Sequence, residues 1–335
     1  MKFQKLQSAF LLAIGMVMLA VGAQPATVFA APKGAAPATN NNPSVIKISP
    51  LRTDITLKPG ETGKVSVIVT NVTDTPIALK PIENDFVAGD ENGTPAVILD
   101  ERSYAPTHSL KRFMVPISTI TISPHEDKMV DVTIKVPATA QAGGYFGALR
   151  FAPADASESG SVNLGASVVS LILLTVPGDL VENLMLQNFS VEQDGGTSNN
   201  FRSPDGLSAL MRFKNTGNVQ VAPFGVISVK KGDKVVYKKT FNSEQQKDNV
   251  LPDSTRKWTV PLKNLGKFGK YTVTGNFTYG TSNQTIETTK TIWIIPSLYI
   301  WLALGGIALI VILILALTAF LKSYKKRVLR SARRY

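Results

Sequence analysis

Apolar and polar residues alternate along nearly the whole stretch 45–294. In segment 64–70, for example, Val65, Val67 and Val69 fall on one face, while the residues between them are mostly polar. This period of two is typical of antiparallel β-strands with one buried face and one wet face. Turn signals such as Asn92-Gly93 recur between the runs. We therefore predict an all-β fold class, with many short strands packed as sandwiches.

A weak internal repeat divides this stretch. Three times an apolar segment runs into a Pro-led turn, at Pro59, Pro124 and Pro252, and an alternating strand follows six residues later. Proline presets φ and cannot donate to a strand ladder, so it marks the break between strands. We predict two tandem Ig-like β-sandwich domains, residues 45–177 and 178–294. The nearly continuous apolar run 168–176 predicts a strand covered on both faces.

The amino-terminal 30 residues have the pattern of a secretory signal peptide. Lys2 and Lys5 precede a short apolar run over residues 9–21, and small residues follow before a cleavage site expected after Ala30. An uncleaved anchor is the alternative, although the run is short for a spanning helix. Residues 31–44 are rich in Ala, Pro and Asn, and we expect a flexible leader there.

A second apolar run predicts a single transmembrane helix over residues 298–321. Its uncharged part would span about 34 Å at 1.5 Å per residue, enough for a hydrocarbon core of about 30 Å. Aromatic residues stand at its entry, namely Trp293, Tyr299 and Trp301. Residues 322–335 contain seven basic side chains and no acid, so we expect a cytoplasmic tail beside the lipid bilayer and an extracellular body. No LPxTG-like sorting pentapeptide precedes the span.

Composition excludes several classes of function. The chain has no cysteine and only two histidines, which removes disulfide scaffolds, thiolate metal sites and Cys nucleophiles. The formal charge is +12, but nine of the 36 Lys and Arg residues lie at the two chain ends. A nucleic-acid binder concentrates its charge on the folded domain. We therefore expect no nucleic acid as partner.

The sequence offers no catalytic, cofactor-binding or metal-binding residue. Neither His108 nor His125 belongs to a recognisable nucleophile or zinc motif, and both are expected in loops. Asp90 and Glu91 precede Asn92-Gly93, which favours a hairpin turn over a cation site. We predict that the chain is not an enzyme and has no cofactor.

Three further features have a functional alternative to a structural interpretation. The glycines of segment 143–151 indicate close backbone approach in a core strand rather than a phosphate cradle. Aromatic side chains that stack on sugars are candidates at Tyr104, Phe113 and Trp258, although most aromatics in a sandwich are core. A basic cluster, Arg102, Lys111 and Arg112, either meets an acidic polymer or forms a solvated loop. The ligand-contacting residues stay unknown.

The layout resembles the bacterial cell-surface proteins that interact with WxL-domain proteins. The segments that carry the resemblance are LKPGETGKV (57–65), VTNVT (69–73), PISTITISP (116–124), VTIKVP (132–137), GGYFGALRF (143–151), FKNTG (213–217) and GKYTV (269–273). It implies a peptidoglycan-binding Ig-like domain, a second Ig-like domain that binds host factors, a membrane span and a basic tail. It transfers no ligand-contacting residue to this chain.

We therefore expect a single-pass protein of the cell membrane that binds or scaffolds cell-wall components. The partners expected are peptidoglycan or another cell-wall polymer, surface proteins of the WxL type, and the lipid bilayer. The alternative is an envelope chaperone or assembly module that captures client strands by β-strand addition at an open sheet edge.

Overall fold

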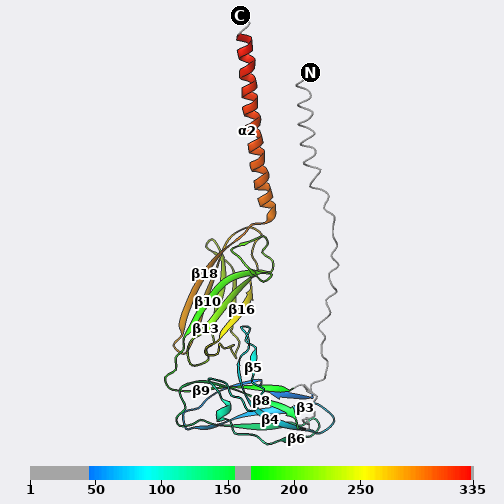
Figure 1. Ribbon diagram of the computed structural model, residues 1–335, viewed down its shortest axis with the longest axis vertical. Coiled ribbons are helices and arrows are strands. Elements are labelled where there is room, and N and C mark those ends of the chain that lie inside the picture. The colour runs from blue at the N-terminus through cyan, green and yellow to red at the C-terminus, as the bar shows by residue number, and fades with distance from the viewer. Residues whose placement is uncertain (1–44, 155–166, 333–335) are drawn as a thin grey trace. The chain divides into compact units, whose positions relative to one another are not determined.

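The computed structural model describes residues 45–154 and 167–332, with side chains to Tyr324 (Figure 1). Residues Ser44–Tyr335 form one compact unit. The predicted signal peptide (1–30), the predicted leader (31–44) and the end of the predicted tail lie outside the described residues. Within them, the all-β fold class is confirmed: two Ig-like sandwiches are followed by one apolar helix.

The first sandwich packs a three-stranded sheet against a larger one. The smaller sheet has the order β1 (Ile46–Ser49), β3 (Thr62–Asn71), β7 (Asp127–Lys135). The larger sheet has the order β2 (Arg52–Thr56), β9 (Val168–Val176), β8 (Gly143–Pro153), β4 (Ile77–Ala88), with β5 (Pro95–Val97) and β6 (Ile120–Ile122) both paired to β4. The chain changes sheet at Pro50, because proline cannot continue a ladder. Strand β2 then runs parallel to β9.

The second sandwich has a four-stranded and a five-stranded sheet. The first has the order β11 (Gly196–Thr197), β10 (Leu184–Gln193), β13 (Ser208–Asn215), β16 (Thr255–Pro261). The second has the order β12 (Asn200–Phe201), β18 (Gln284–Ile294), β17 (Gly269–Tyr279), β14 (Phe224–Lys231), β15 (Lys234–Phe241). All pairings in the second sandwich are antiparallel except that of β12 with β18.

Each sandwich has a core made by the predicted alternation. Val65, Val67 and Val69 are buried on the inner face of β3, and the matching residues of β7 meet them. The second core contains Phe213 and Phe277, whose ring centroids are 5.1 Å apart in an edge-to-face arrangement. Fully burying one large apolar side chain contributes about 1.5–3 kcal/mol, so these faces hold the sheets together.

The three Pro-led turns of the repeat adopt the same conformation. The residue after each proline has a positive φ: +82° at Gly60, +56° at His125 and +56° at Asp253. Each turn is closed by a backbone hydrogen bond of 3.0 to 3.2 Å. The N–H of the fourth turn residue donates to the carbonyl of the first, the residue before the proline. Proline followed by a positive φ is the pattern of a type II turn. The repeat in the sequence therefore corresponds to a repeated turn in the fold.

Strand β9 is covered on both faces, as its continuous apolar run predicts. Ile172, Leu174 and Val176 point into the first core. On the opposite face, Leu173 packs with a small cluster that includes Leu251 of the second sandwich. The second face is thus covered by side chains of the first sandwich together with Leu251, a contact that the sequence pattern does not identify.

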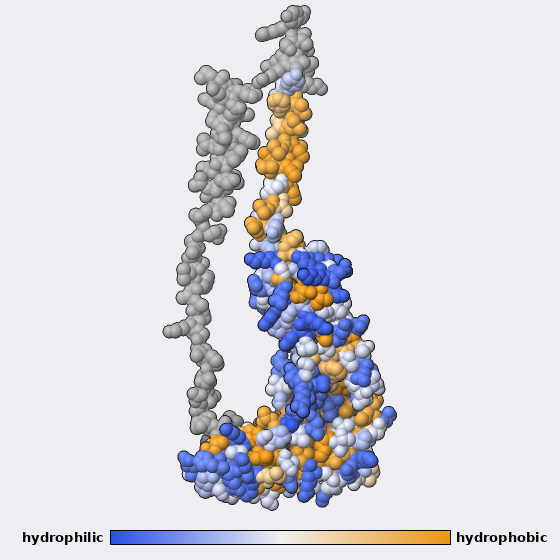
Figure 2. Space-filling view, turned by 180° about the vertical axis from the view of Figure 1, so that it is seen from behind, coloured by the Kyte–Doolittle hydropathy of each residue, from blue (hydrophilic) through white to orange (hydrophobic). Residues whose placement is uncertain are grey.

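The carboxy-terminal helix α2 spans Ser297–Ala332 and is longer than predicted. It begins one residue before the expected span 298–321 and continues into the basic segment, because no Pro or Gly stops it there. The part Ser297–Tyr324 is long and apolar enough to cross a membrane, and Figure 2 shows its apolar surface. Among the described residues, no other helix is long and apolar enough to cross a membrane. The one other helical element there is the 3-10 turn η1 (Lys111–Phe113).

Candidate functional site

A cleft of about 380 Å³ opens on the first sandwich beside the irregular loop 105–113. The start of β8 forms its other wall, and Asn218 of the second sandwich closes one end. Several candidates that the sequence suggests separately are brought to this region: His108, Phe113 and Arg112 line the cleft, and Tyr104 lies directly beside it.

The buried carboxylate of Asp85 holds the loop in place. Asp85 is 0% exposed at the end of β4. Its Oδ2 accepts the Ala105 N–H at 2.9 Å and the Ser109 hydroxyl at 2.6 Å, and its Oδ1 accepts the Lys111 N–H at 2.9 Å. A buried charge is tolerated when donors satisfy it, so the three donors stabilise Asp85 and the carboxylate orders the loop. Sequence reasoning missed this residue, since a lone Asp within a strand gives no signal.

His108 is half-buried and bridges the loop to β8. Its Nδ1 lies 2.6 Å from the carbonyl oxygen of Gly144. A carbonyl only accepts, so Nδ1 carries the proton and Nε2 is an acceptor in the neutral ring. The His108 carbonyl accepts the Phe146 N–H at 2.8 Å. With a φ of +58°, His108 turns the chain at this point. The expectation that His108 lies in a loop is confirmed, but its side chain bonds to a distant strand rather than locally.

Two aromatic rings form the floor of the cleft. The centroids of Phe113 and Tyr145 are 4.8 Å apart, with the rings tilted by 52°. Both are half-buried and rest on the first core. The Tyr145 hydroxyl donates to the Gln141 carbonyl at 2.9 Å, and burial raises the pKa of this phenol. The floor is therefore rigid and keeps its neutral hydroxyl across the physiological range of pH.

The basic cluster divides into residues with different environments. The Arg112 guanidinium lies 4.5 Å from the Tyr104 ring centroid, and the Lys111 ammonium lies 5.0 Å from the same centroid. Lys111 also donates to the carbonyls of Glu101 and Ser103, so it closes the loop on itself. Arg102 is exposed and does not line the cleft. Among the described residues that line the cleft, Arg112 is therefore the one Lys or Arg side chain.

This lining suits a polar ring compound with an apolar face. No carboxylate is among the described residues that line the cleft, so Arg112 gives it a positive potential. Besides His108 and Tyr145, the polar residues of the lining are Thr107, Gln141 and Asn218, while the Ser109 hydroxyl is already donated to Asp85. Saccharides present apolar faces to aromatic rings and hydroxyls to amides, and guanidinium groups bind carboxylates in a bidentate way.

The end of the cleft is built by the junction between the two sandwiches. The Gly144 N–H donates to the Asn218 carbonyl at 2.8 Å, and the Asn218 amide donates to the Ala142 carbonyl at 3.2 Å. A Cβ on Gly143, whose φ is +150°, would lie 2.8 Å from the Asn218 carbonyl oxygen, so the backbone of the second sandwich favours glycine there. The predicted close backbone approach in segment 143–151 is confirmed, and the partner is the second sandwich.

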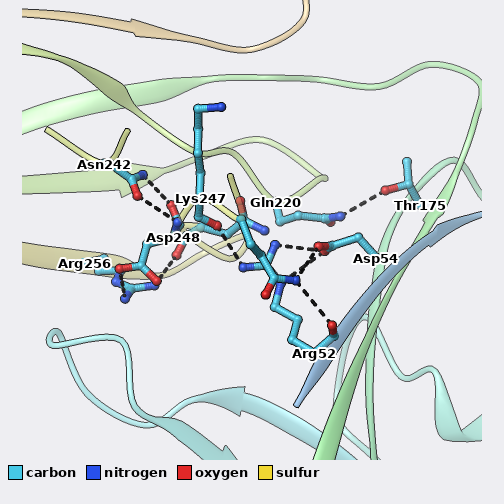
Figure 3. A network of polar contacts seen from close by, with 10 residues as sticks. Arg52, Asp54, Thr175, Gln220, Asn242, Lys247, Asp248 and Arg256 are labelled. Atoms are coloured by element: carbon cyan, nitrogen blue, oxygen red, sulfur yellow. Dashed lines mark hydrogen bonds and ion pairs between the residues drawn. The ribbon is translucent and has the colours of Figure 1, made fainter. Parts of the chain in front are cut away.

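Further polar contacts join the sandwiches along this junction (Figure 3). Arg52 of β2 donates to the Lys247 carbonyl at 2.9 Å, and the Gln220 amide donates to the Thr175 hydroxyl at 3.0 Å. On the second sandwich, Arg256 pairs with Asp248 at 2.9 Å and thereby supports the loop that carries Lys247.

The segment around Asp90 forms a hairpin turn, as predicted. Asp90 Oδ1 accepts the N–H groups of Asn92 and Thr94 at 2.9 and 3.0 Å. The hydrogen bond from the Thr94 backbone is the main cause that lowers the pKa of Asp90. Glu91, at the tip, pairs with Arg212 of the second sandwich, and this hydrogen bond raises the pKa of the guanidinium. The carboxylates therefore serve the turn and the junction.

The remaining candidates have structural surroundings. Trp258 is half-buried within the second core, with the Phe241 ring centroid 5.4 Å away and Arg256 over its face. His125 lies in an exposed turn, where its Nε2 is 2.9 Å from Asp74. Within 45–154 and 167–332, no group of three or more His, Asp or Glu side chains is placed to hold a metal ion.

No model of a known protein family matches the chain, and no curated protein does. Among solved structures, the chain is similar to the class 5 fimbriae chaperone CfaA, with 15% identity and a TM-score of 0.36 over 73% of this chain and 98% of that one. It is similar to the CupB2 chaperone of Pseudomonas aeruginosa, with 10% identity and a TM-score of 0.31 over 73% and 99%. It is also similar to a chain of the CsuC–CsuE complex of Acinetobacter baumannii, a chaperone with a tip adhesion subunit. The identity is 15% and the TM-score 0.34, over 72% of this chain and 97% of that one. At such low identity and TM-score, these likenesses carry no argument about what this chain binds.

Proposed function

We propose that this protein is anchored in the cell membrane by α2 and binds a saccharide unit of a cell-wall polymer, such as peptidoglycan, in the cleft beside loop 105–113. The observation that carries the proposal is the rigid aromatic floor of Phe113 and Tyr145 next to the single cation Arg112. The role that we propose is binding without turnover, because the described lining offers no carboxylate for acid–base chemistry.

The anchor supports such a role through local concentration. A helix of the length and apolar character of α2 keeps the sandwiches beside the wall, which multiplies a weak affinity for its repeating units. The basic residues after the span favour a cytoplasmic tail and extracellular sandwiches. Protease added to intact cells should then degrade the sandwiches while a cytoplasmic marker survives, and their survival would contradict this orientation.

Sedimentation with purified peptidoglycan tests the cleft. The full chain in detergent is mixed with insoluble polymer and the bound fraction is measured at low salt. Arg112→Ala and Phe113→Ala should each weaken binding about tenfold, the loss expected for a charge-assisted hydrogen bond or a stacked ring. Arg102→Ala is the matched control, since Arg102 belongs to the same loop but does not line the cleft. Equal losses in all three variants would reject the cleft as the site.

A second candidate function, the capture of an extended client segment, is favoured by the open edge of β7. Within the described residues, that side of β7 is met only near its end, by the bridge from Met114 to Ile134 and a hydrogen bond from Val115 to Thr133. An open edge is a template for strand addition, and a WxL-type surface protein is the partner that the resemblance implies. The charges of Asp127, Lys128 and Asp131 oppose indiscriminate pairing and make this the second candidate.

Wall digestion separates the two candidates. A tagged full chain is isolated from membranes with and without prior digestion of the wall polymer. Client capture at β7 predicts that the same protein partner is recovered after digestion. Wall binding predicts that recovery of co-isolated material depends on intact polymer and on Arg112.

A further inference from the structure

The pairing register of the strands shows which residues lie at the end of the second sandwich where the helix α2 begins. Strand β18 ends at Ile294 and α2 begins at Ser297, so this end of the sheet is two residues from the helix. Gly269 of β17 lies opposite Ile294 and Lys270 lies opposite Trp293. Lys230 of β14 lies opposite Thr272 of β17, so the β14–β15 turn is at the same end.

Five exposed lysines gather at this end, and we refer to them as the lysine patch: Lys230, Lys231, Lys234, Lys267 and Lys270. The acid among them is Asp233, in the β14–β15 turn. Asp194 and Asp205 also lie toward this end, but they belong to the loops around β11–β13. None of the five lysines forms an ion pair within the described residues. The Lys231 ammonium donates to the Phe268 carbonyl at 2.9 Å and lies 5.4 Å from the Tyr271 ring centroid of β17.

Exposed aromatic rings stand among these lysines. Phe268 is 50% exposed and Trp293 is 42% exposed. The Phe268 ring centroid is 5.1 Å from that of Tyr299, in the first turn of α2. Large exposed aromatics beside lysines suit the headgroup layer of a bilayer, where one side of the ring is apolar and the other is wet.

We propose that the lysine patch, with Phe268 and Trp293, docks the second sandwich on anionic lipid headgroups of the bilayer that α2 crosses. Neighbouring strands are about 4.8 Å apart, so the β14–β15 turn is only about 15 Å from the helix exit and within reach of the headgroups. Each basic residue near an anionic surface strengthens the contact about fivefold. The inference rests on the proposed placement of α2 in a membrane, and it implies that the bilayer limits how far the sandwich swings.

A label in the β14–β15 turn tests this contact. The chain has no cysteine, so Asp233→Cys gives a single site for a spin label in the full chain. The protein is reconstituted in vesicles of phosphatidylcholine alone or with about 30% phosphatidylglycerol, the anionic lipid that creates the attracting surface potential. Collision with a headgroup-bound relaxing agent should be several-fold greater in the anionic vesicles and should fall in high salt. The same label at Gln245→Cys, in the loop after β15, should respond to neither lipid nor salt.

Charge reversals identify the surface responsible. Lys267→Glu with Lys270→Glu should reduce the membrane-contact equilibrium at least about 25-fold, from two lysines at about fivefold each. Lys238→Glu with Lys239→Glu, the same change farther along β15, should leave the contact within about twofold. Equal losses from both pairs, contact that ignores anionic lipid, or spin–spin coupling that shows a second copy on the patch would each overturn the proposal. Arg112→Ala leaves this contact unchanged, so a failure of wall binding is distinguishable.

Discussion

Asn71 and Asn215 make equivalent contacts in the two sandwiches. Each is fully buried at the end of a strand, and each donates its side-chain amide to the carbonyl four residues later, Asn71 to Thr75 at 2.8 Å and Asn215 to Val219 at 2.7 Å. Each amide also donates to the segment that enters a Pro-led turn, at Ser123 or Val250. The side-chain oxygens accept the N–H two residues on, at 2.9 and 2.8 Å. One polar clamp is therefore used twice.

Replacement of either clamp should destabilise the protein strongly. Asn71→Ala or Asn215→Ala leaves buried carbonyls without donors, and we expect a loss of about 2–3 kcal/mol in the free energy of unfolding. Chemical denaturation measures it. Asn276→Ala, which removes an exposed side chain from β17, is the control and should change stability by less than about 0.5 kcal/mol. A clamp variant as stable as this control would contradict the assigned contacts.

Gly147→Val should impair folding because β8 is tightly packed. A Cβ at this position lies 3.0 Å from the Leu110 side chain, so valine overpacks the core by about 1–3 kcal/mol. Gly196→Ala is the control, since its nearest contact would be an ordinary 3.6 Å. Thermal melting of the two variants should separate them. An unchanged melting temperature for Gly147→Val would show that Leu110 yields at no cost.

The ion pair of Glu91 with Arg212 should couple the two sandwiches weakly. Arg212 Nε donates to Glu91 at 2.9 Å, but the side chains stay 37% and 41% exposed, so solvent screens the pair. We expect a small but measurable coupling in a double-mutant cycle of Glu91→Ala and Arg212→Ala, because solvent screening weakens exposed ion pairs. The exchanged pair, Glu91→Arg with Arg212→Glu, should recover more stability than either single reversal. A coupling of zero would show that this ion pair does not stabilise the junction between the sandwiches.

Acid should weaken the β4–β5 hairpin. Hydrogen bonds lower the pKa of Asp90 below its ordinary value of 3.8, so the folded state binds the proton less readily than the unfolded state. The contribution of Asp90 is thus complete above the unfolded pKa and is lost as pH falls through the folded one. The difference in denaturation midpoint between the native chain and Asp90→Asn should shrink as the pH falls below the ordinary carboxyl pKa of 3.8. A difference that is independent of pH would exclude the carboxylate as its source.

The strands, the two sandwiches and the apolar helix could all be predicted from the pattern of residues along the chain. The alternation of Val65, Val67 and Val69 is sufficient because burial of one sheet face is a local property of every second residue. The Pro-led turns at Pro59, Pro124 and Pro252 are also predictable from the sequence, because the preset φ of proline acts within the four residues of the turn.

The cleft and the lysine patch are decided only by the tertiary structure. Phe113 and Tyr145 are 32 positions apart, and they meet because Asp85, on a third segment, draws the loop onto β8. Glu91 reaches Arg212 across a sequence distance of 121. Lys231 reaches the Phe268 carbonyl only through the pairing of β14 with β17. Contacts of this kind depend on which sheets pack and in which register, and no short window of residues contains that information.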